Sequence, residues 1–327
     1  MNKEIIQLEP QSIWKNFSKL NAVPRPSKKE ERVINFMMDF GRSLQLETFK
    51  DEVGNVIIRK EASPGMEDRK TVTLQSHLDM VHQKNSSTDF NFDTQGIEMY
   101  VDGDWVRARG TTLGADNGMG VAAIMSLLES NDIPHPPLEA LFTIDEETGM
   151  TGAKGLKGDM LRGQILLNLD TEEDDEIDIG CAGGIDVTAT RSYLEENVPA
   201  GSIAYGISVK GLHGGHSGMD IHRGFGNANK IMNRLLFKST EEFGLRVAQI
   251  DGGSLRNAIP RESFATIVLE KVRKKDFEDK ISAWIQEIKS ENSFIETKLE
   301  INLNEVEIPE NRSLEPFLYA YLFLCCN

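Results

Sequence analysis

The sequence predicts an α/β protein with two domains: a first domain with a largely parallel central sheet flanked by helices, and a smaller ferredoxin-like second domain. Up to about residue 170, apolar strand patterns alternate with helical patterns, the order that produces parallel sheets. From 203 to 304 the order becomes strand, helix, strand, strand, helix, strand, which is typical of the ferredoxin-like fold. We therefore expect domains at 1–186 and 187–308, followed by a tail, 309–327, that fits neither pattern.

The first domain is expected to hold four strands and three longer helical segments. Ser27 and Glu30 have the spacing of a capping box at the start of the second helix, and apolar residues follow at helical spacing. The polar stretch 82–112, with a hairpin tip at 102–104, is expected to form a loop over the site. The predicted helices are 9–21, 27–44 and 116–130, with a short one near 151–161, and the predicted strands are 53–58, 71–76, 138–144 and 165–169.

The second domain is expected to begin after the glycine-rich segment 181–184. Its strands have apolar patterns of ordinary length, and its two helices carry apolar residues three and four apart. The predicted strands are 203–210, 244–250, 264–271 and 297–304, and the predicted helices are 227–240 and 276–289.

Composition excludes several classes of protein. The 327 residues include 36 basic and 52 acidic ones, and the net charge of −16 argues against nucleic acid or an anionic membrane as a partner. Three cysteines are too few for a disulfide framework, which favours a reducing compartment. The first residues lack a signal-peptide pattern, and no segment approaches the roughly 20 apolar residues that span a bilayer. We expect a cytoplasmic protein.

A histidine and several carboxylates stand where apolar strands stop or helices begin. His77, Glu146 with Glu147, and Asp170 follow predicted strands, and Asp116 precedes a predicted helix. The carboxyl ends of parallel strands open on one crevice, so these side chains are expected to converge there. One imidazole with several carboxylates is the ligand set of a divalent metal ion, zinc first.

Each of these residues also has a simpler interpretation. A lone histidine at a strand end is usually structural, but Asp79 lies two residues beyond His77 on the same side, where it can fix the imidazole tautomer. The simpler interpretation of Asp116 is a helix N-cap, a role that aspartate fills well and that is compatible with metal binding. Glu146 and Glu147 are the strongest signal, because adjacent carboxylates at a strand end repel each other unless a cation or proton separates them. We expect Glu147 on the metal and Glu146 as the proton acceptor.

A glycine-rich turn in the second domain carries His213 and His216. The sequence 215–219 breaks the pattern of a serine-hydrolase nucleophile elbow, so serine catalysis is not expected. A histidine in such a turn suits donation to a developing oxyanion.

Together these motifs resemble the aminoacyl-histidine dipeptidase branch of the co-catalytic zinc aminopeptidase and carboxypeptidase family, in order from about residue 5 to 308. The segments that carry the resemblance are 76–81, 110–118, 145–149, 167–170 and 215–218. The resemblance implies a zinc-peptidase-like catalytic domain, a lid domain at 187–308, and hydrolysis of short unblocked dipeptides, preferably Xaa-His.

The resemblance also implies roles for individual residues. Two zinc ions, for which Co²⁺ or Mn²⁺ are possible substitutes, would be bridged by Asp116, with His77 and Asp170 on one ion and Glu147 on the other. Asp79 would orient His77, Glu146 would be the general base, and His216 would stabilise the transition state. Asn257 would line the substrate side of the lid domain, through which a homodimer could form.

One departure from the family pattern concerns the second metal. The family takes a further histidine from near the C-terminus, but the six histidines lie at 77, 82, 135, 213, 216 and 222. We expect a C-terminally truncated chain with a weak second metal, little or no activity, and apolar sheet surface left open. The alternatives are an N-acyl amino acid amidohydrolase, a tripeptidase, or a non-catalytic remnant that binds one metal or a partner subunit.

Overall fold

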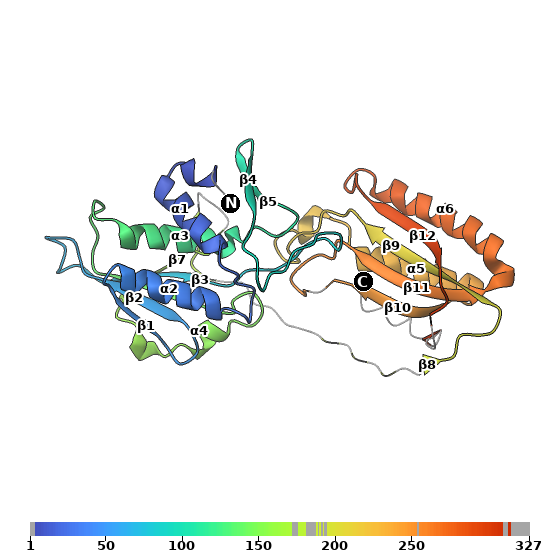
Figure 1. Ribbon diagram of the computed structural model, residues 1–327, viewed down its shortest axis with the longest axis horizontal. Coiled ribbons are helices and arrows are strands. Elements are labelled where there is room, and N and C mark those ends of the chain that lie inside the picture. The colour runs from blue at the N-terminus through green and yellow to red at the C-terminus, as the bar shows by residue number, and fades with distance from the viewer. Residues whose placement is uncertain are drawn as a thin grey trace. The chain divides into compact units, whose positions relative to one another are not determined.

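The computed structural model divides into two compact units, Met1–Cys181 and Ala182–Asn327 (Figure 1). It describes residues 4–171, 176–180, 188, 190, 192, 195–253, 255–309 and 313–314. Most of the predicted tail, 309–327, and the segment 181–184 therefore lie outside the described residues.

The first unit is built on a five-stranded sheet of order β1-β2-β6-β3-β7. Strand β3 pairs in parallel with β6 and β7, whereas β2 pairs antiparallel with β6 and β1. The predicted α/β class is confirmed, and the sheet is mixed, with its parallel pairings centred on β3. The strands are β1 (Glu47–Lys50), β2 (Val56–Lys60), β3 (Val72–His77), β6 (Leu138–Thr143) and β7 (Ile165–Asn168).

Helices α2 (Glu31–Ser43) and α3 (Ala115–Glu129) supply apolar residues to one core with the sheet. That core takes alternate residues of the strands, such as Leu74, Ala140 and Phe142, because alternate side chains share one sheet face. Helix α1 (Gln11–Asn21) packs against α3. The remaining elements of this unit are the 3₁₀ turns Ile5–Gln7 and Gly158–Met160, the short helix α4 (Thr151–Gly155), and a hairpin of β4 (Met99–Asp102) and β5 (Trp105–Ala108).

One local prediction about this unit is wrong, and one strand was not predicted. The capping box is wrong: Glu30 is itself the N-cap residue of α2, without a side-chain cap, and the Ser27 hydroxyl instead donates to Asp79 at 2.8 Å. Strand β1 was not predicted, because its four residues are all exposed or half-buried and give no apolar run. Tertiary pairing with β2 makes it a strand.

Strand β7 is the last strand of the sheet beside β3, and all four of its residues are exposed. Leu166 and Leu167 are 54% and 50% exposed although they belong to an apolar strand. This agrees with the expectation of open apolar sheet surface.

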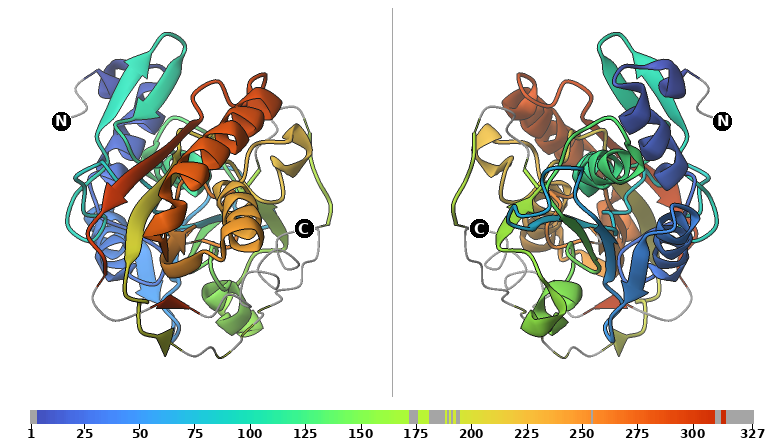
Figure 2. Two further views of the ribbon diagram at one scale, coloured as in Figure 1. Left: turned by 90° about the vertical axis from the view of Figure 1, so that its right-hand side faces the viewer. Right: turned by 90° about the vertical axis from the view of Figure 1, so that its left-hand side faces the viewer.

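The second unit contains an antiparallel sheet of order β10-β11-β9-β12. Numbered along the chain, these strands have the order 2-3-1-4 of the predicted ferredoxin-like arrangement. The strands are β9 (Ser202–Lys210), β10 (Arg246–Gly252), β11 (Ser263–Glu270) and β12 (Glu300–Val306). Helices α5 (Ala228–Phe243) and α6 (Lys274–Asn292) lie side by side on one face of this sheet (Figure 2).

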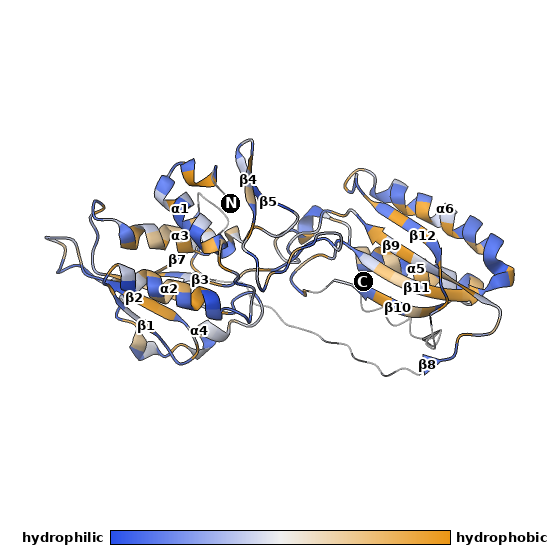
Figure 3. Ribbon diagram, in the orientation of Figure 1, coloured by the Kyte–Doolittle hydropathy of each residue, from blue (hydrophilic) through white to orange (hydrophobic). Residues whose placement is uncertain are grey.

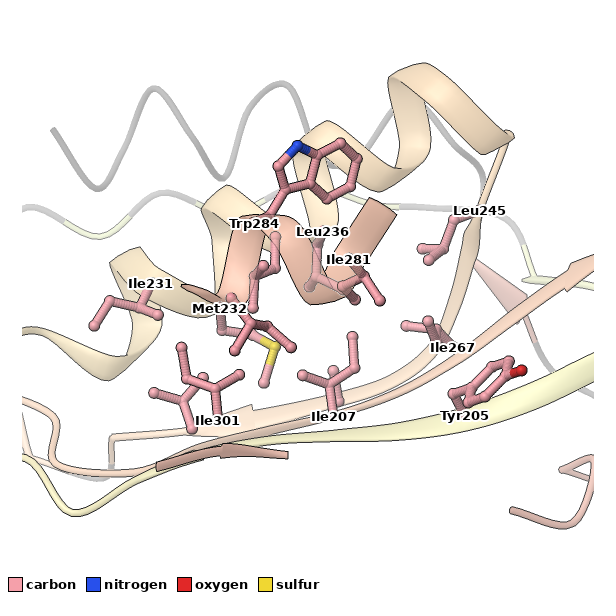
Figure 4. Close-up of a cluster of buried hydrophobic side chains, with 14 of the residues drawn as sticks. Tyr205, Ile207, Ile231, Met232, Leu236, Leu245, Ile267, Ile281, Trp284 and Ile301 are labelled. Carbon is pink, nitrogen blue, oxygen red and sulfur yellow. The ribbon is translucent and has the colours of Figure 1, made fainter. Parts of the chain in front are cut away.

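One hydrophobic core joins these helices to the sheet. Met232 and Leu236 of α5 and Trp284 of α6 lie over Ile207 and Ile267 of the strands (Figure 4). Helix α6 alternates hydrophobic and hydrophilic residues, as expected for a helix that covers a sheet on one side (Figure 3). The smaller elements of this unit are β8 (Glu195–Glu196), β13 (Ser313–Leu314) and the 3₁₀ turns Ile221–Arg223 and Lys271–Arg273. None of the helices in the described part of the chain is long and apolar enough to cross a membrane.

Candidate metal centre

The parallel part of the first sheet brings the predicted residues together. His77 is the last residue of β3 and pairs in register with Thr143, the last residue of β6. The chain leaves β6 into the turn that carries Glu146 and Glu147, and it leaves β7 two residues before Asp170. All three strands are parallel, so these side chains emerge at the same edge of the sheet.

The imidazole of His77 lies at the centre of this group. Its Nε2 is 3.1 Å from Asp116 Oδ1, 3.7 Å from Asp170 Oδ1 and 3.9 Å from Glu146 Oε2. Two sets of three ligand atoms each lie within 4.8 Å of one another: those of His77, Glu146 and Asp170, and those of His77, Asp116 and Glu147. We call these five residues the open group. The side chains of Asp116 and Glu146 are 58% and 35% exposed, so solutes can reach it.

Asp79 orients the imidazole. His77 Nδ1 lies 3.1 Å from the backbone carbonyl oxygen of Asp79 and 3.3 Å from its carboxylate Oδ1. Both atoms are acceptors, so Nδ1 carries a proton and Nε2 faces the carboxylates. A metal-ligating histidine is held in this way by its surroundings.

The ionisation of His77 reflects the surrounding negative charge. Burial alone would lower its pKa, but hydrogen bonds to Asp116 and Asp79 outweigh burial and raise the pKa to about 10. Without a metal, a proton therefore stands on Nε2 near neutral pH, where a metal ion would take its place.

Three of the four carboxyl groups of the open group have raised pKa values. Burial, and next the charge of Asp116, raise the pKa of Glu147 to about 7. Burial also raises the pKa values of Glu146 and Asp170. Asp116 differs, because its hydrogen bond with His77 lowers its pKa. Carboxylates this close together repel one another unless a cation lies between them. With the imidazole nitrogen of His77 they form a ligand set suited to a divalent metal ion.

The entry to α3 directs Asp116 to this group. Asp116 and Asn117 have non-helical backbone angles inside the helix, and the N-cap position belongs to Gly114. The chain therefore leaves helical geometry at the residue that lies beside His77. The Asn117 amide donates to the Leu169 carbonyl oxygen at 2.9 Å and to Asp170 Oδ1 at 2.5 Å, which ties the entry of α3 to the end of β7.

A second acidic cluster, formed by Glu30, Asp79 and Asp145, lies beside the open group. Its ligand atoms also lie within 4.8 Å of one another, and all three residues are buried. We call it the sealed group, because donors occupy it. Asp79 accepts from the Ser27 hydroxyl and from the backbone N–H groups of Glu146 and Glu147, and Asp145 accepts from the hydroxyls of Thr148 and Thr151. These donors stabilise the negative charge of the carboxylates, as a bound cation otherwise would.

In the second unit, His216 lies on an exposed loop with a defined tautomer. Its Nδ1 accepts from the backbone N–H groups of Gly218 and Met219, both at 3.1 Å. Nε2 is therefore the protonated nitrogen and a donor. The loop pairs with the segment that carries Asn257 through an isolated bridge between His216 and Ala258, and the Asn257 carbonyl oxygen accepts from Ser217 N–H at 2.8 Å. The structure thus brings His216 and Asn257 to adjacent segments.

Every residue predicted for the first-domain site lies in or against the open group. Ser27, Glu30 and Asn117 also contact the site residues, and the sequence did not predict these contacts. Ser27 and Glu30 gave a signal that was interpreted as helix capping, and no local pattern indicated that they face Asp79 and Asp145 across the fold.

Comparisons with known proteins agree with this fold. Residues 55–211 match the model of peptidase family M28, and residues 207–295 match that of the peptidase dimerisation domain. The chain is 46% identical over 303 residues to the cytosol non-specific dipeptidase of Escherichia coli K12. The alignment covers 93% of this chain and 62% of that protein. These matches define a relative of the peptidases.

A solved structure indicates which branch of the peptidases the chain resembles. The aminoacylhistidine dipeptidase of Vibrio alginolyticus is 42% identical, with a TM-score of 0.55, over 99% of this chain and 66% of that one. The predicted resemblance to the aminoacylhistidine dipeptidase branch is therefore confirmed. The chain spans just under two thirds of the length of these two relatives.

Proposed function

We propose that the chain's function is metal-dependent hydrolysis of dipeptides, with a preference for Xaa-His. The observation that carries the proposal is the open group: one oriented imidazole and four carboxylates, gathered at one edge of the sheet and accessible to solutes. The similarity to dipeptidases supports the substrate class. The name of the Escherichia coli relative supports a cytoplasmic location.

The ligand set is proposed from the same residues. His77 and Asp170 would hold one ion, Glu147 the other, and Asp116 both. Zinc suits an imidazole with carboxylates, and Co²⁺ or Mn²⁺ are possible substitutes. When bound, the ions would supply Lewis-acid chemistry at the scissile carbonyl and to the attacking water.

Glu146 is the proposed general base. Its backbone N–H donates to Asp79 Oδ1 at 3.0 Å, which fixes the start of its side chain, and its Oε2 lies 3.9 Å from His77 Nε2. Burial raises its pKa, so the carboxylate is a better proton acceptor than an exposed glutamate. Glu146 would accept a proton from the attacking water at Oε2 and return it to the leaving amine.

The second unit is proposed to contribute to substrate binding and to stabilisation of the transition state. The free Nε2–H of His216 supports a role as donor to the oxyanion, because Nδ1 is already occupied by two backbone donors. Asn257 is proposed to line the substrate side. The match to the peptidase dimerisation domain supports a homodimer formed through this unit.

The single histidine of the open group limits the second ion. Both ligand sets use His77, and its Nε2 can serve one ion, so among the residues that the structure describes the other ion has Asp116 and Glu147. A catalytic zinc normally has three protein ligands. We therefore expect one firmly held ion, one weak ion, and low turnover by this chain.

The test is hydrolysis of β-alanyl-histidine by the purified chain with added zinc, with and without a chelator. The proposal predicts slow, zinc-dependent release of histidine that rises as zinc is raised toward saturation of the weaker site. Release of product from an N-acyl amino acid or a tripeptide, but from no dipeptide, would favour one of the alternative hydrolases. Firm zinc binding without hydrolysis of any of these at saturating zinc would favour a non-catalytic metal-binding chain.

A further inference from the structure

A short segment between α1 and α2, Arg25–Glu30, contacts three of the loops that carry the open group. Its Pro26 pairs with Met80 just beyond β3 in an isolated parallel bridge, and the Met80 N–H donates to the Arg25 carbonyl oxygen at 3.2 Å. The segment therefore runs beside the chain that leaves His77.

Arg25 joins two of these loops through their carbonyl oxygens. Its Nη1 donates to the carbonyl oxygens of Leu78 at 3.0 Å and Asp79 at 3.1 Å. Its Nη2 donates to the carbonyl oxygen of Gly114 at 2.5 Å, two residues before Asp116. The side chain is almost completely buried. One guanidinium thus fixes the chain after His77 relative to the entry of α3.

Ser27 reaches the third loop through Asp79. Its hydroxyl donates to Asp79 Oδ2 at 2.8 Å, and the same carboxylate accepts from Glu146 N–H at 3.0 Å and Glu147 N–H at 3.2 Å. The position of the Asp79 carboxylate therefore sets the backbone position of both glutamates.

Glu30 holds the residue before those glutamates. Its Oε1 accepts from Lys28 N–H at 2.8 Å and from Asp145 N–H at 3.1 Å. Asp145 is buried and has a positive φ of 51°, an uncommon conformation for a residue with a side chain. The hydrogen bond from Asp145 N–H to Glu30 helps to keep this turn in place, with Glu146 and Glu147 directed to His77.

We propose that Arg25–Glu30 is a positioning element of the metal centre, and that Ser27 and Glu30 are positioning residues for Glu146 and Glu147. The importance of this element for metal binding and hydrolysis rests on the proposed function, whereas its contacts with the three loops do not. Neither residue is among the ligands or the proposed catalytic groups. They act through the backbone of the turn that carries the base and one ligand.

The variants are chosen to separate position from charge. Glu30→Ala removes the acceptor of Asp145 N–H, whereas Glu30→Gln keeps a carbonyl oxygen there without the charge. Ser27→Ala removes the donor to Asp79, whereas Ser27→Thr keeps it. Glu31→Ala, an exposed neighbour on the first turn of α2, is the matched control.

The first measurement is zinc affinity, by competition with a chromogenic chelator, on variants that circular dichroism shows to be folded. Loss of a residue that orients metal ligands typically costs about 10- to 100-fold in affinity. We expect a loss in this range for Glu30→Ala and Ser27→Ala, and affinities close to wild type for Glu30→Gln, Ser27→Thr and Glu31→Ala. An equal loss for Glu30→Gln and Glu30→Ala would overturn the positioning role, because charge rather than position would then matter.

The second measurement is hydrogen exchange of the peptide containing 144–150 in the metal-free chain. We expect faster exchange in Ser27→Ala and Glu30→Ala, and wild-type exchange in the two conservative variants. Unchanged exchange in all variants would overturn the inference. If the wild-type chain bound no zinc, the proposed function would fail, and this exchange experiment would still decide whether Ser27 and Glu30 hold the turn.

Discussion

The open and sealed groups lie next to each other in the first unit and both gather carboxylates, yet only the open group includes an imidazole and has side chains accessible to solutes. In the sealed group, Asp79 and Asp145 accept from hydroxyl and backbone donors and are almost completely buried. In the open group, side chains are accessible, and burial together with neighbouring carboxylates raises the pKa of Glu147 to about 7. Acidic residues in proximity do not by themselves indicate a metal site, because solvent access and an imidazole ligand distinguish the open group from the sealed one.

The two groups are also connected. The Asp79 carboxylate lies 3.3 Å from His77 Nδ1 on one side. On the other side it accepts hydrogen bonds from the backbone N–H groups of Glu146 and Glu147. The sealed group therefore orients the open one. Substitutions in the open group should change metal binding and chemistry, whereas those in the sealed group should change stability or geometry.

The largest effect is expected for Glu146→Gln. A general base contributes about 10² to 10⁴ in rate, so zinc-dependent hydrolysis of β-alanyl-histidine should fall by that factor while zinc still binds. Steady-state kinetics and a zinc titration of the same preparation measure both. Glu61→Gln, an exposed carboxylate on the same unit, is the control. Retained hydrolysis in Glu146→Gln would remove Glu146 from the mechanism.

Next in size is the effect of Glu147→Gln on the weaker ion. Glu147 is one of the two carboxylates left to that ion, so its affinity should fall by about tenfold or more while the firmly held ion remains. Calorimetric titration with zinc resolves the two phases. If the firm phase were lost instead, the assignment of Glu147 to the weaker ion would be incorrect.

The metal-free chain should lose stability as pH rises. The pKa of His77 is about 10 in the folded chain against an ordinary 6.5, so its contribution is complete below 6.5 and is lost as pH approaches 10. The raised pKa of Glu147 acts in the same direction at lower pH, between its ordinary 4.5 and about 7. From pH 7 to 10 we expect the free energy of unfolding to fall by about 2 kcal/mol or more.

Urea unfolding with a chelator at the two pH values measures this change. The same experiment on His77→Gln corrects for groups elsewhere that titrate near pH 10, and saturating zinc should flatten the wild-type dependence because the metal replaces the proton. An equal loss in wild type and His77→Gln would show that His77 is not the responsible group.

The smallest effect is expected in the sealed group. Thr151→Val removes one hydroxyl donor to Asp145 while Thr148 still donates. Loss of a hydrogen bond to a buried carboxylate should lower the free energy of unfolding by about 1 to 2 kcal/mol and leave zinc affinity unchanged. Thermal unfolding and chelator competition check this. A gain in zinc affinity would mean that the sealed group takes a cation once a donor is removed.

The sequence predicted the residues of the open group better than the residues that hold them in position. His77, Glu146 and Asp170 follow apolar strands, and the parallel pairing of β3 with its neighbours is enough to bring them together. Ser27 and Glu30 could not be assigned in the same way, because a capping box and a contact with a distant carboxylate have the same local pattern. Only the packing of the segment 25–30 beside Met80 separates the two.

The fold shows the same division. The order of strands and helices in the second unit was predicted, since each element carries its own apolar period. Strand β1 lacks such a period and depends on pairing with β2. The entry of α3 was also hidden, because Asp116 and Asn117 sit inside a sequence of good helical pattern and leave helical geometry to reach His77 and Asp170.

The most direct test of the open group is a zinc titration of the wild-type chain and of His77→Ala, followed by calorimetry and by the visible spectrum of the Co²⁺ forms. The account predicts one firmly held and one weaker ion in the wild type. It predicts no firmly held ion in His77→Ala, although that variant keeps the whole sealed group. Wild-type affinity in His77→Ala would contradict the account, because the cation would then be held by some other part of the chain.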